Sequence, residues 1–262
     1  MPLALATLGL PRTPLDQVVG LAADHGWQGL ELRCASDQPV RLQLDAGQRR
    51  NIARSFTRAG IVPLTLASYI GIAAPGPDGP VVKDLIEHLR LAADLGCRNL
   101  RVFPHGGPGP IGAADARAVH RLREVAGQAS LLGVRVLVET HDSHRSAAAL
   151  TELLDQVGRP GVGALWDLLH TWLDGESPIG AYRALAPHLA YVQVKDVASA
   201  SDLTPLPLGE GVLPLAACVR LLPRESWISW EYEAPWHPQA VPLAPLLGAG
   251  ARCLERMRAR EE

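Results

Sequence analysis

Short apolar runs alternate with amphipathic stretches along almost the whole chain. The apolar runs are typical of buried strands, and strands that alternate with helices in this way are typical of a parallel sheet wound with helices. The strands are expected at residues 3–9, 27–34, 61–68, 97–107, 134–144, 161–167, 189–196 and 226–233.

The amphipathic stretches carry the signals that begin and end helices. In the first of them, Thr13 can cap the helix and Pro14 suits its first turn. Gly60 and Gly96 stand where two later helices should end. The segments 71–80 and 198–211 are rich in proline or polar residues and are expected to be loops. The helices are expected at residues 13–26, 45–60, 81–96, 113–133, 146–158, 177–188, 213–222 and 244–258.

Eight strand and helix units follow one another without a low-complexity linker. The length of 262 residues is close to the roughly 250 that are typical of one eight-stranded α/β barrel. The sequence therefore predicts a single (β/α)8 TIM barrel, with one domain over residues 1–262.

Composition excludes several classes of protein. The chain is 47% hydrophobic and 20% charged with a net charge of −2, so no basic field points to a nucleic-acid partner. The four cysteines are far apart and form no CxxC pair, which argues against a zinc knuckle or a redox dithiol. The N-terminus lacks the pattern of a signal peptide, and no segment approaches the ~18 apolar residues of a membrane span. A cytoplasmic protein is expected.

Four oxygen-bearing side chains stand at the ends of four successive apolar runs: Glu139, Asp167, Gln193 and Glu231. If these runs are parallel strands of one barrel, the four side chains converge at its C-terminal mouth, where barrel enzymes place catalytic groups. Three carboxylates crowded there would repel one another, each pair by about 4 kcal/mol at 4 Å and an effective dielectric of 20. A bound divalent metal would remove that repulsion.

Strand alternation tests whether these side chains can face one another. If Glu139 points into the barrel, His141 does so too, and the same parity groups Gln193 with Lys195. Any one of the acids could be a solvated carboxylate at a strand end, because strand ends meet water. Four oxygen donors in successive strands favour a common site.

Four motifs along the chain resemble those of the xylose isomerase-like barrels: VETHDSH, WDLLH, LGEG and WEYE. That family includes sugar isomerases and epimerases, inosose and dehydroshikimate dehydratases, and relatives of the AP endonucleases. The resemblance covers nearly the whole chain, and the order and register of the motifs are more specific than any one of them.

The resemblance implies that one divalent metal ion is bound by the four residues Glu139, Asp167, Gln193 and Glu231. Gln193 departs from the commonest pattern, in which a histidine takes this position. An amide oxygen still suits a hard cation, and the loss of imidazole favours Mn²⁺, Mg²⁺ or Co²⁺ over Zn²⁺. Glutamine also occurs at this position in dehydroshikimate dehydratase-like members.

The implied substrate is a small polyhydroxylated carbonyl compound, which loses a proton next to its metal-bound carbonyl to form an enediolate. Glu139 and Glu231 could move the proton, and His170 could polarise a substrate oxygen or act as an acid. Isomerisation or epimerisation is the first hypothesis. Dehydration of a cyclic polyol ketone or of 3-dehydroshikimate is the alternative.

Four further polar residues could line the mouth and touch the substrate, although each also has a purely structural explanation. Lys195 could form a salt bridge to Glu233 or Asp196, and Arg101 could pair with an acid such as Glu31. A histidine in this region could simply hydrogen-bond to a neighbouring loop. The predicted substrate-binding residues are His141, Lys195, Arg101 and His105.

Two other classes of protein fit the sequence less well than an isomerase. The AP endonucleases of the resembling family need three zinc ions and extra histidines, and this chain has TLASYIG and DLTPLPLGEG where two of these elements would stand. The net charge of −2 also disfavours binding to DNA. A metal-binding barrel without catalytic activity is disfavoured by the presence of both Glu139 and Glu231. The sequence is compatible with a homodimer.

Overall fold

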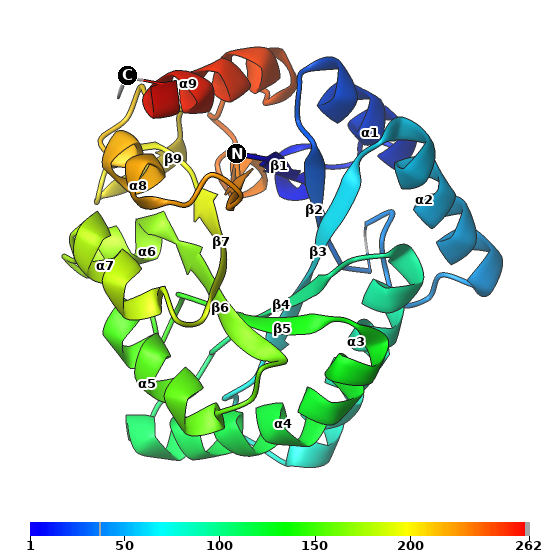
Figure 1. Cartoon of the computed structure of the whole chain (residues 1–262), viewed down its shortest axis with the longest axis vertical. Helices are drawn as coiled ribbons and strands as arrows, with labels where there is room; N and C mark the ends of the chain where they lie inside the picture. Colours follow the sequence, from blue (N-terminus) through cyan, green and yellow to red (C-terminus); the bar gives the residue numbers. More distant parts are fainter. Residues whose placement is uncertain (37, 260–262) are drawn as a thin grey trace.

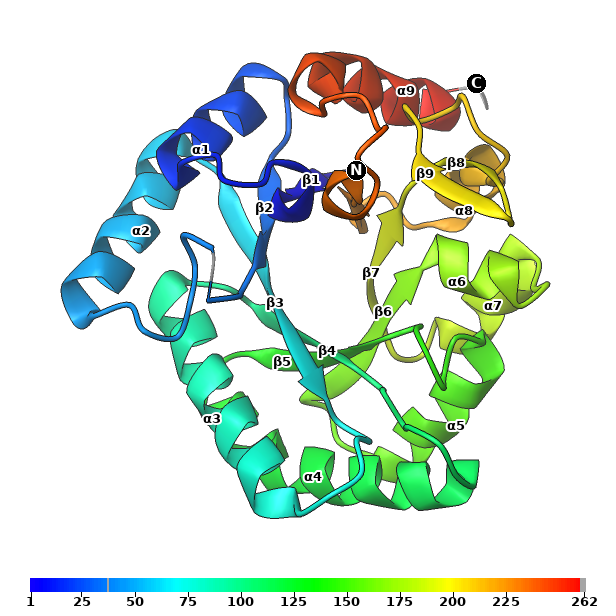
Figure 2. The ribbon, with the colours of Figure 1, turned by 180° about the vertical axis from the view of Figure 1, so that it is seen from behind.

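Eight parallel strands pair side by side until the last meets the first, so that they form one closed barrel in the order β1-β10-β7-β6-β5-β4-β3-β2. Helices surround this barrel on the outside (Figures 1 and 2). The structure is a computed structural model that describes residues 1–36 and 38–259. The predicted (β/α)8 fold is confirmed.

The elements follow the alternation of the sequence. The barrel strands are β1 Leu3–Ala6, β2 Gly29–Arg33, β3 Val62–Gly71, β4 Asn99–Phe103, β5 Arg135–Glu139, β6 Val162–Asp167, β7 Leu189–Val194 and β10 Trp227–Trp230. The α-helices are α1 Leu15–Asp24, α2 Ala46–Ala59, α3 Asp78–Leu95, α4 Ile111–Leu132, α5 Ala147–Val157, α6 Leu168–Leu173, α7 Pro178–Leu185, α8 Leu215–Leu221 and α9 Leu247–Ala259. Short 3-10 helices are η1 Thr7–Gly9, η2 Ala234–Trp236 and η3 Ala244–Leu246.

Side chains alternate between the inside of the barrel and the layer under the helices, as expected for strands buried on both faces. In β5, Val136 and Val138 belong to the large core between strands and helices. Leu137 lies between them and belongs to a small inner cluster with Leu165 of β6 and Tyr191 of β7. Residues two positions further along each of these strands therefore also face the barrel axis.

The strand register sets the heights of the polar side chains at the mouth. Asp167 on β6 is paired with Gln193 on β7, and Gln193 is paired with Ser229 on β10. Two residues beyond these pairs on the same strands stand Lys195 and Glu231, so they come side by side just above Gln193.

The structure differs from the expected elements in several places, of which three follow. The residues after Asp167 form the short helix α6, because the Asp167 carboxylate caps it by accepting a hydrogen bond from the Leu169 amide at 2.8 Å. The segment expected to be a loop at 198–211 begins with a hairpin of β8 Val197–Ser199 and β9 Asp202–Pro205. Helix α3 begins at Asp78, three residues before the expected 81.

No helix among residues 1–36 and 38–259 is long and apolar enough to cross a bilayer.

Candidate active site at the barrel mouth

The C-terminal ends of the barrel strands form the mouth of the barrel, and the four predicted metal ligands meet there. Glu139 and Asp167 are the last residues of β5 and β6, Gln193 lies near the end of β7, and Glu231 follows β10. All four side chains are buried. The fold therefore brings together side chains that are far apart in sequence, since Glu139 and Glu231 are 92 positions apart.

Lys195 lies at the centre of the acids on one side of the mouth. Its Nζ is 2.8 Å from Asp167 Oδ2, 2.5 Å from Glu231 Oε2 and 2.5 Å from Glu233 Oε1. Burial by itself would lower the pKa of Lys195, but these carboxylates raise that pKa well above its usual value. The ammonium group donates hydrogen bonds to Glu231 and Glu233, whereas its contact with Asp167 Oδ2 is an ion pair without a hydrogen bond. The pair with Glu233 was expected from the sequence as a structural role.

Gln193 is held by carboxylates on both sides. Its Nε2 donates a hydrogen bond to Glu31 Oε1 at 2.6 Å and another to Glu231 Oε1 at 3.4 Å. Its Oε1 is buried and has no hydrogen-bond partner. Burial raises the pKa of Glu31 to about 7, and repulsion from Glu231 adds to that rise. The hydrogen bond to Glu231 places the amide nitrogen of Gln193, and not its amide oxygen, next to that carboxylate.

Glu139 lies on the other side of the mouth, where Arg101 is its cationic neighbour. The Nε of Arg101 is 3.2 Å from Glu139 Oε2, and its guanidinium lies 4.0 Å from the centre of the Phe103 ring. Arg101 also donates a hydrogen bond to the Ser68 carbonyl at 2.9 Å. Burial raises the pKa of Glu139 well above its usual value although Arg101 opposes this rise. Arg101 therefore fixes the position of Glu139, and the side chain of Arg101 is itself buried.

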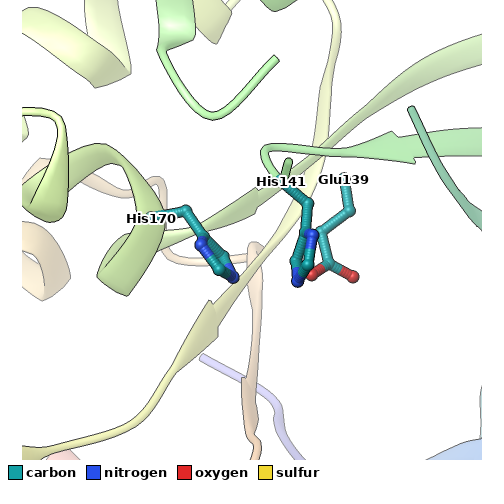
Figure 3. Close-up of side chains that lie close together, drawn as sticks. All are labelled: Glu139, His141 and His170. Carbon is teal, nitrogen blue, oxygen red and sulfur yellow. The ribbon is translucent and has the colours of Figure 1, made fainter. Parts of the chain in front are cut away.

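Two histidines extend this side of the mouth towards solvent. Figure 3 shows the rings of His141 and His170 turned towards each other beside the carboxylate of Glu139. The ring centres are 4.1 Å apart, and one ligand atom from each of the three residues lies within 4.8 Å of the others. Burial lowers the pKa of His170 to about 4. His170 projects from α6, the helix that the Asp167 carboxylate caps.

The loops after β4 and β5 each contain a residue with an unusual backbone conformation near His141. Asp142 and His105 both have positive φ, 46° and 51°, which residues other than glycine rarely adopt. This turn places Asp142 Oδ1 at 2.9 Å from His141 Nδ1 and Asp142 Oδ2 at 3.6 Å from His105 Nδ1. The side chain of His105 is 67% exposed, so it lies at the outer rim and not beside the buried acids. Strain of this kind is concentrated at functional sites.

The side chains at the mouth fit a divalent cation. Five carboxyl groups face two cationic side chains there, so negative charge remains when all are ionised; the acids are Glu31, Glu139, Asp167, Glu231 and Glu233, and the cations are Arg101 and Lys195. Four buried oxygens of carboxyl and amide groups there also lack a hydrogen bond, namely Glu31 Oε2, Glu139 Oε2, Asp167 Oδ2 and Gln193 Oε1. Buried oxygens of this kind are what a hard metal ion binds.

Sequence reasoning missed three residues of this site. Glu31 was considered only as a partner of Arg101, yet it accepts the shortest hydrogen bond of Gln193. Asp142 was not among the predicted site residues, yet its carboxylate lies beside His141. Asp196 was considered only as a partner of Lys195, but its carboxylate accepts hydrogen bonds from the amides of 209, 211 and 213. A charged residue inside an apolar strand was the available signal for Glu31.

Space at the mouth is limited, because side chains fill it. A small cavity of about 10 Å³ is bordered by Glu31, Arg33, Tyr69, Arg101 and Glu231, among others. A wider cavity of about 460 Å³ lies between α8 and α9, away from the mouth, and contains none of the predicted site residues. The chemistry of the strand ends, and not the volume of a cavity, marks the candidate site.

The sequence profile of the xylose isomerase-like TIM barrel family matches residues 19–257. The chain belongs to this family. One protein sequence and two solved structures, described next, are similar to this chain.

A 3-dehydroshikimate dehydratase from Bacillus anthracis is 24% identical over 195 residues, which is 71% of this chain and 68% of the relative. The structure of the IOLI protein with a bound zinc atom has a TM-score of 0.84 at 17% identity, covering 100% of this chain and 99% of that one. The structure of a D-psicose 3-epimerase in the presence of D-fructose has a TM-score of 0.79 at 15% identity, covering 98% of both chains. The structural likenesses show the fold.

Proposed function

We propose that this protein is a divalent-metal-dependent isomerase or epimerase of a small polyhydroxylated carbonyl compound. The observation that carries the proposal is the pair of buried glutamates, Glu139 and Glu231, at the ends of strands that β6 and β7 separate. A substrate held between them would present opposite sides to two carboxylates. That arrangement suits removal of a proton on one side and its return on the other.

When bound, the metal ion would polarise the substrate carbonyl and so acidify the neighbouring C–H. Its ligands are proposed to come from Glu139, Asp167, Gln193 and Glu231, and such oxygen donors suit Mn²⁺, Mg²⁺ or Co²⁺. The role of the protein is then to hold and move the proton.

Each glutamate has a neighbour that fixes the oxygen it offers. Lys195 holds Glu231 Oε2, which leaves Oε1 beside the Gln193 amide, and Arg101 lies beside Glu139 Oε2. His170 stands at the edge of the mouth, where its ring could donate to or accept from a substrate oxygen. His141 and Lys195 are proposed to contact substrate hydroxyl groups, and His105, whose side chain is 67% exposed, is proposed to do so from the outer rim of the mouth.

A dehydratase is the second candidate, and the sequence relative that is a 3-dehydroshikimate dehydratase supports it. Dehydration begins with the same proton removal next to the carbonyl, after which a β-hydroxyl group leaves as water. The added requirement is an acid for the departing hydroxyl. His170 or Lys195 could supply that proton.

Incubation of the metal-loaded protein with ketoses, inososes and 3-dehydroshikimate in deuterated water tests the proposal. Deuterium at a carbon next to the carbonyl, without loss of water, is expected for the isomerase or epimerase. A conjugated product that absorbs in the ultraviolet would instead establish the dehydratase. Cleavage of an abasic DNA duplex, with no reaction on the panel, would overturn the substrate class.

A further inference from the structure

One buried hydrogen bond crosses the interior of the barrel from β7 to β2. The amide nitrogen of Gln193 donates to Glu31 Oε1 at 2.6 Å, and both side chains are buried. Strands β10 and β1 lie between β7 and β2, so the two residues are not neighbours in the sheet. Strand pairing alone does not join them, and the contact is made by their long side chains.

The two intervening strands carry small side chains at this level. Ser229 on β10 is paired with Gln193, and Ala6 on β1 is paired with Glu31. Side chains of paired residues stand on the same face of a sheet, so Ser229 and Ala6 also face the barrel axis. Their small size leaves room for Glu31 and Gln193 to meet.

We infer that Glu31 is a positioning residue for the metal site, because it holds the amide of Gln193 with the nitrogen towards β2 and thereby presents the oxygen to the divalent ion. The inference deepens the proposed function and rests on its four metal ligands. Glu31 acts through Gln193 and is not itself proposed as a ligand.

The side-chain amide of Gln193 has two ends, and only one of them can bind a cation. The nitrogen carries two protons that it donates, whereas the oxygen has two lone pairs. With Nε2 bonded to Glu31, the other end of the amide is left for the ion, and Oε1 is indeed buried without a hydrogen-bond partner. Reversal of the amide would place Oε1 against a carboxylate oxygen, and two acceptors repel each other. Glu31 therefore decides which atom of Gln193 is offered.

Glu31 holds this amide more firmly than Glu231 does. The hydrogen bond from Nε2 to Glu31 Oε1 is 2.6 Å long, whereas the contact with Glu231 Oε1 is 3.4 Å, which is longer than usual. Glu231 is also a proposed metal ligand, so its oxygen would be engaged by the ion. Glu31 is thus the acceptor that remains for the amide when the site is loaded.

Titration of the metal-stripped protein with Mn²⁺, followed by the electron paramagnetic resonance signal of the free ion, tests the role of Glu31. Glu31→Leu removes the acceptor and is expected to weaken Mn²⁺ binding about 10 to 100-fold. Glu31→Gln keeps an oxygen that can accept from Gln193, so it should restore most of that affinity. Equal losses in the two variants would overturn the inference. Glu152→Leu on the exposed surface of α5 is the matched control.

A double-mutant cycle separates positioning from a direct effect of the Glu31 charge on the ion. Gln193→Met removes the amide, so adding Glu31→Leu to that variant should weaken Mn²⁺ binding no further. A second loss as large as the loss in the wild-type background would overturn the inference.

Nuclear magnetic resonance of the unmodified protein labelled with ¹⁵N provides a test that needs no Glu31 variant. The side-chain amide signal of Gln193, assigned by its absence from Gln193→Met, should keep a low-field, hydrogen-bonded proton when saturating Mg²⁺ is added. A shift of that proton to the position of solvent-exposed amides would overturn the inference. Dependence of Mn²⁺ binding on Glu31 without turnover of any substrate would reject the proposed function alone. Turnover with Mn²⁺ binding that is independent of Glu31 would reject this positioning role alone.

Discussion

On the β6–β7–β10 side of the mouth, Asp167, Glu231 and Glu233 surround the ammonium of Lys195, whereas on the β5–α6 side Glu139 lies beside His141 and His170. The first side carries its own cation, and one of its carboxylate oxygens, Asp167 Oδ2, has no hydrogen-bond partner. The second side offers imidazole nitrogens, which can bind a cation from solution. One mouth therefore holds two different arrangements: three carboxylates around an ammonium group on the first side, and one carboxylate beside two imidazoles on the second.

The two sides also differ in the cation that lies beside their acids. The Lys195 ammonium is in contact with the three carboxylates of the first side, whereas Glu139 on the second side has the Arg101 guanidinium as its cationic neighbour, with Nε at 3.2 Å from Oε2.

The largest effect is expected from removing the negative charge of one proton-moving group on each side. Glu139→Gln and Glu231→Gln should each reduce deuterium incorporation into the substrate by about 10² to 10⁴-fold. The exposed Glu225→Gln serves as the control. Near-normal exchange in either variant would show that proton transfer does not use both sides.

Removing the positive charge of Lys195 should reduce the stability of the folded protein. Lys195→Met leaves three carboxylates without their counter-ion and is expected to reduce the free energy of unfolding by about 3 to 5 kcal/mol, measured by urea denaturation at pH 7. Lys83→Met is the control, because the Lys83 side chain is 76% exposed. Mn²⁺ should restore part of the loss in Lys195→Met. A loss below about 1 kcal/mol would mean that Lys195 behaves as a surface ion pair.

A smaller effect is expected where the histidine side meets its supporting loop. Asp142→Asn keeps the size of the side chain and removes the charge 2.9 Å from His141 Nδ1. Because His141 is proposed to contact the substrate, deuterium incorporation should fall about 10 to 100-fold. Asp155→Asn, which alters a histidine–aspartate pair far from the mouth, should leave the incorporation unchanged. Equal incorporation by the two variants would show that Asp142 does not position His141.

The smallest effect concerns a buried cation that only one acid holds, His88 on α3. Burial would lower the pKa of His88, but the hydrogen bonds of Asp84 and Cys34 raise it to about 10. Because the folded pKa exceeds the unfolded value, the pair stabilises the protein fully below pH 6.5, and this contribution is lost as the pH rises to about 10. Wild type should therefore lose about 1 to 2 kcal/mol more than His88→Gln between pH 6 and pH 9 in urea denaturation. Parallel curves would contradict the pairing.

Much of the fold followed from local patterns. Apolar runs with period-two alternation placed Leu137 and Glu139 on the same side of β5, and Leu137 indeed lies in the inner cluster. The missed elements were those in which local pattern and tertiary contact disagreed. Helix α6 continues the apolar run of β6, so no change of period announced it, and the capping bond from Asp167 decides where it begins.

The site was only partly accessible to the same reasoning. Parity could place Lys195 and Gln193 on the inner face, but it could not decide which acids they would meet. Those partners depend on strand register and on side chains from β2 and β10, such as Glu31 and Glu231. The metal ligands and the choice between isomerase and dehydratase stay proposals.

The sequence by itself determined that strands and helices alternate, that the strands are buried on both faces, and that four oxygen donors end successive strands. These features depend on residue period and on short-range signals, which need no knowledge of distant partners. Only the tertiary structure decided that an ammonium group lies among the acids of one side and that two histidines complete the other. The distances between charged groups in a closed barrel depend on strand register and loop conformation. Electrostatic energies change strongly when such a distance changes by about 3 Å, and spacing along the chain does not determine distances that finely.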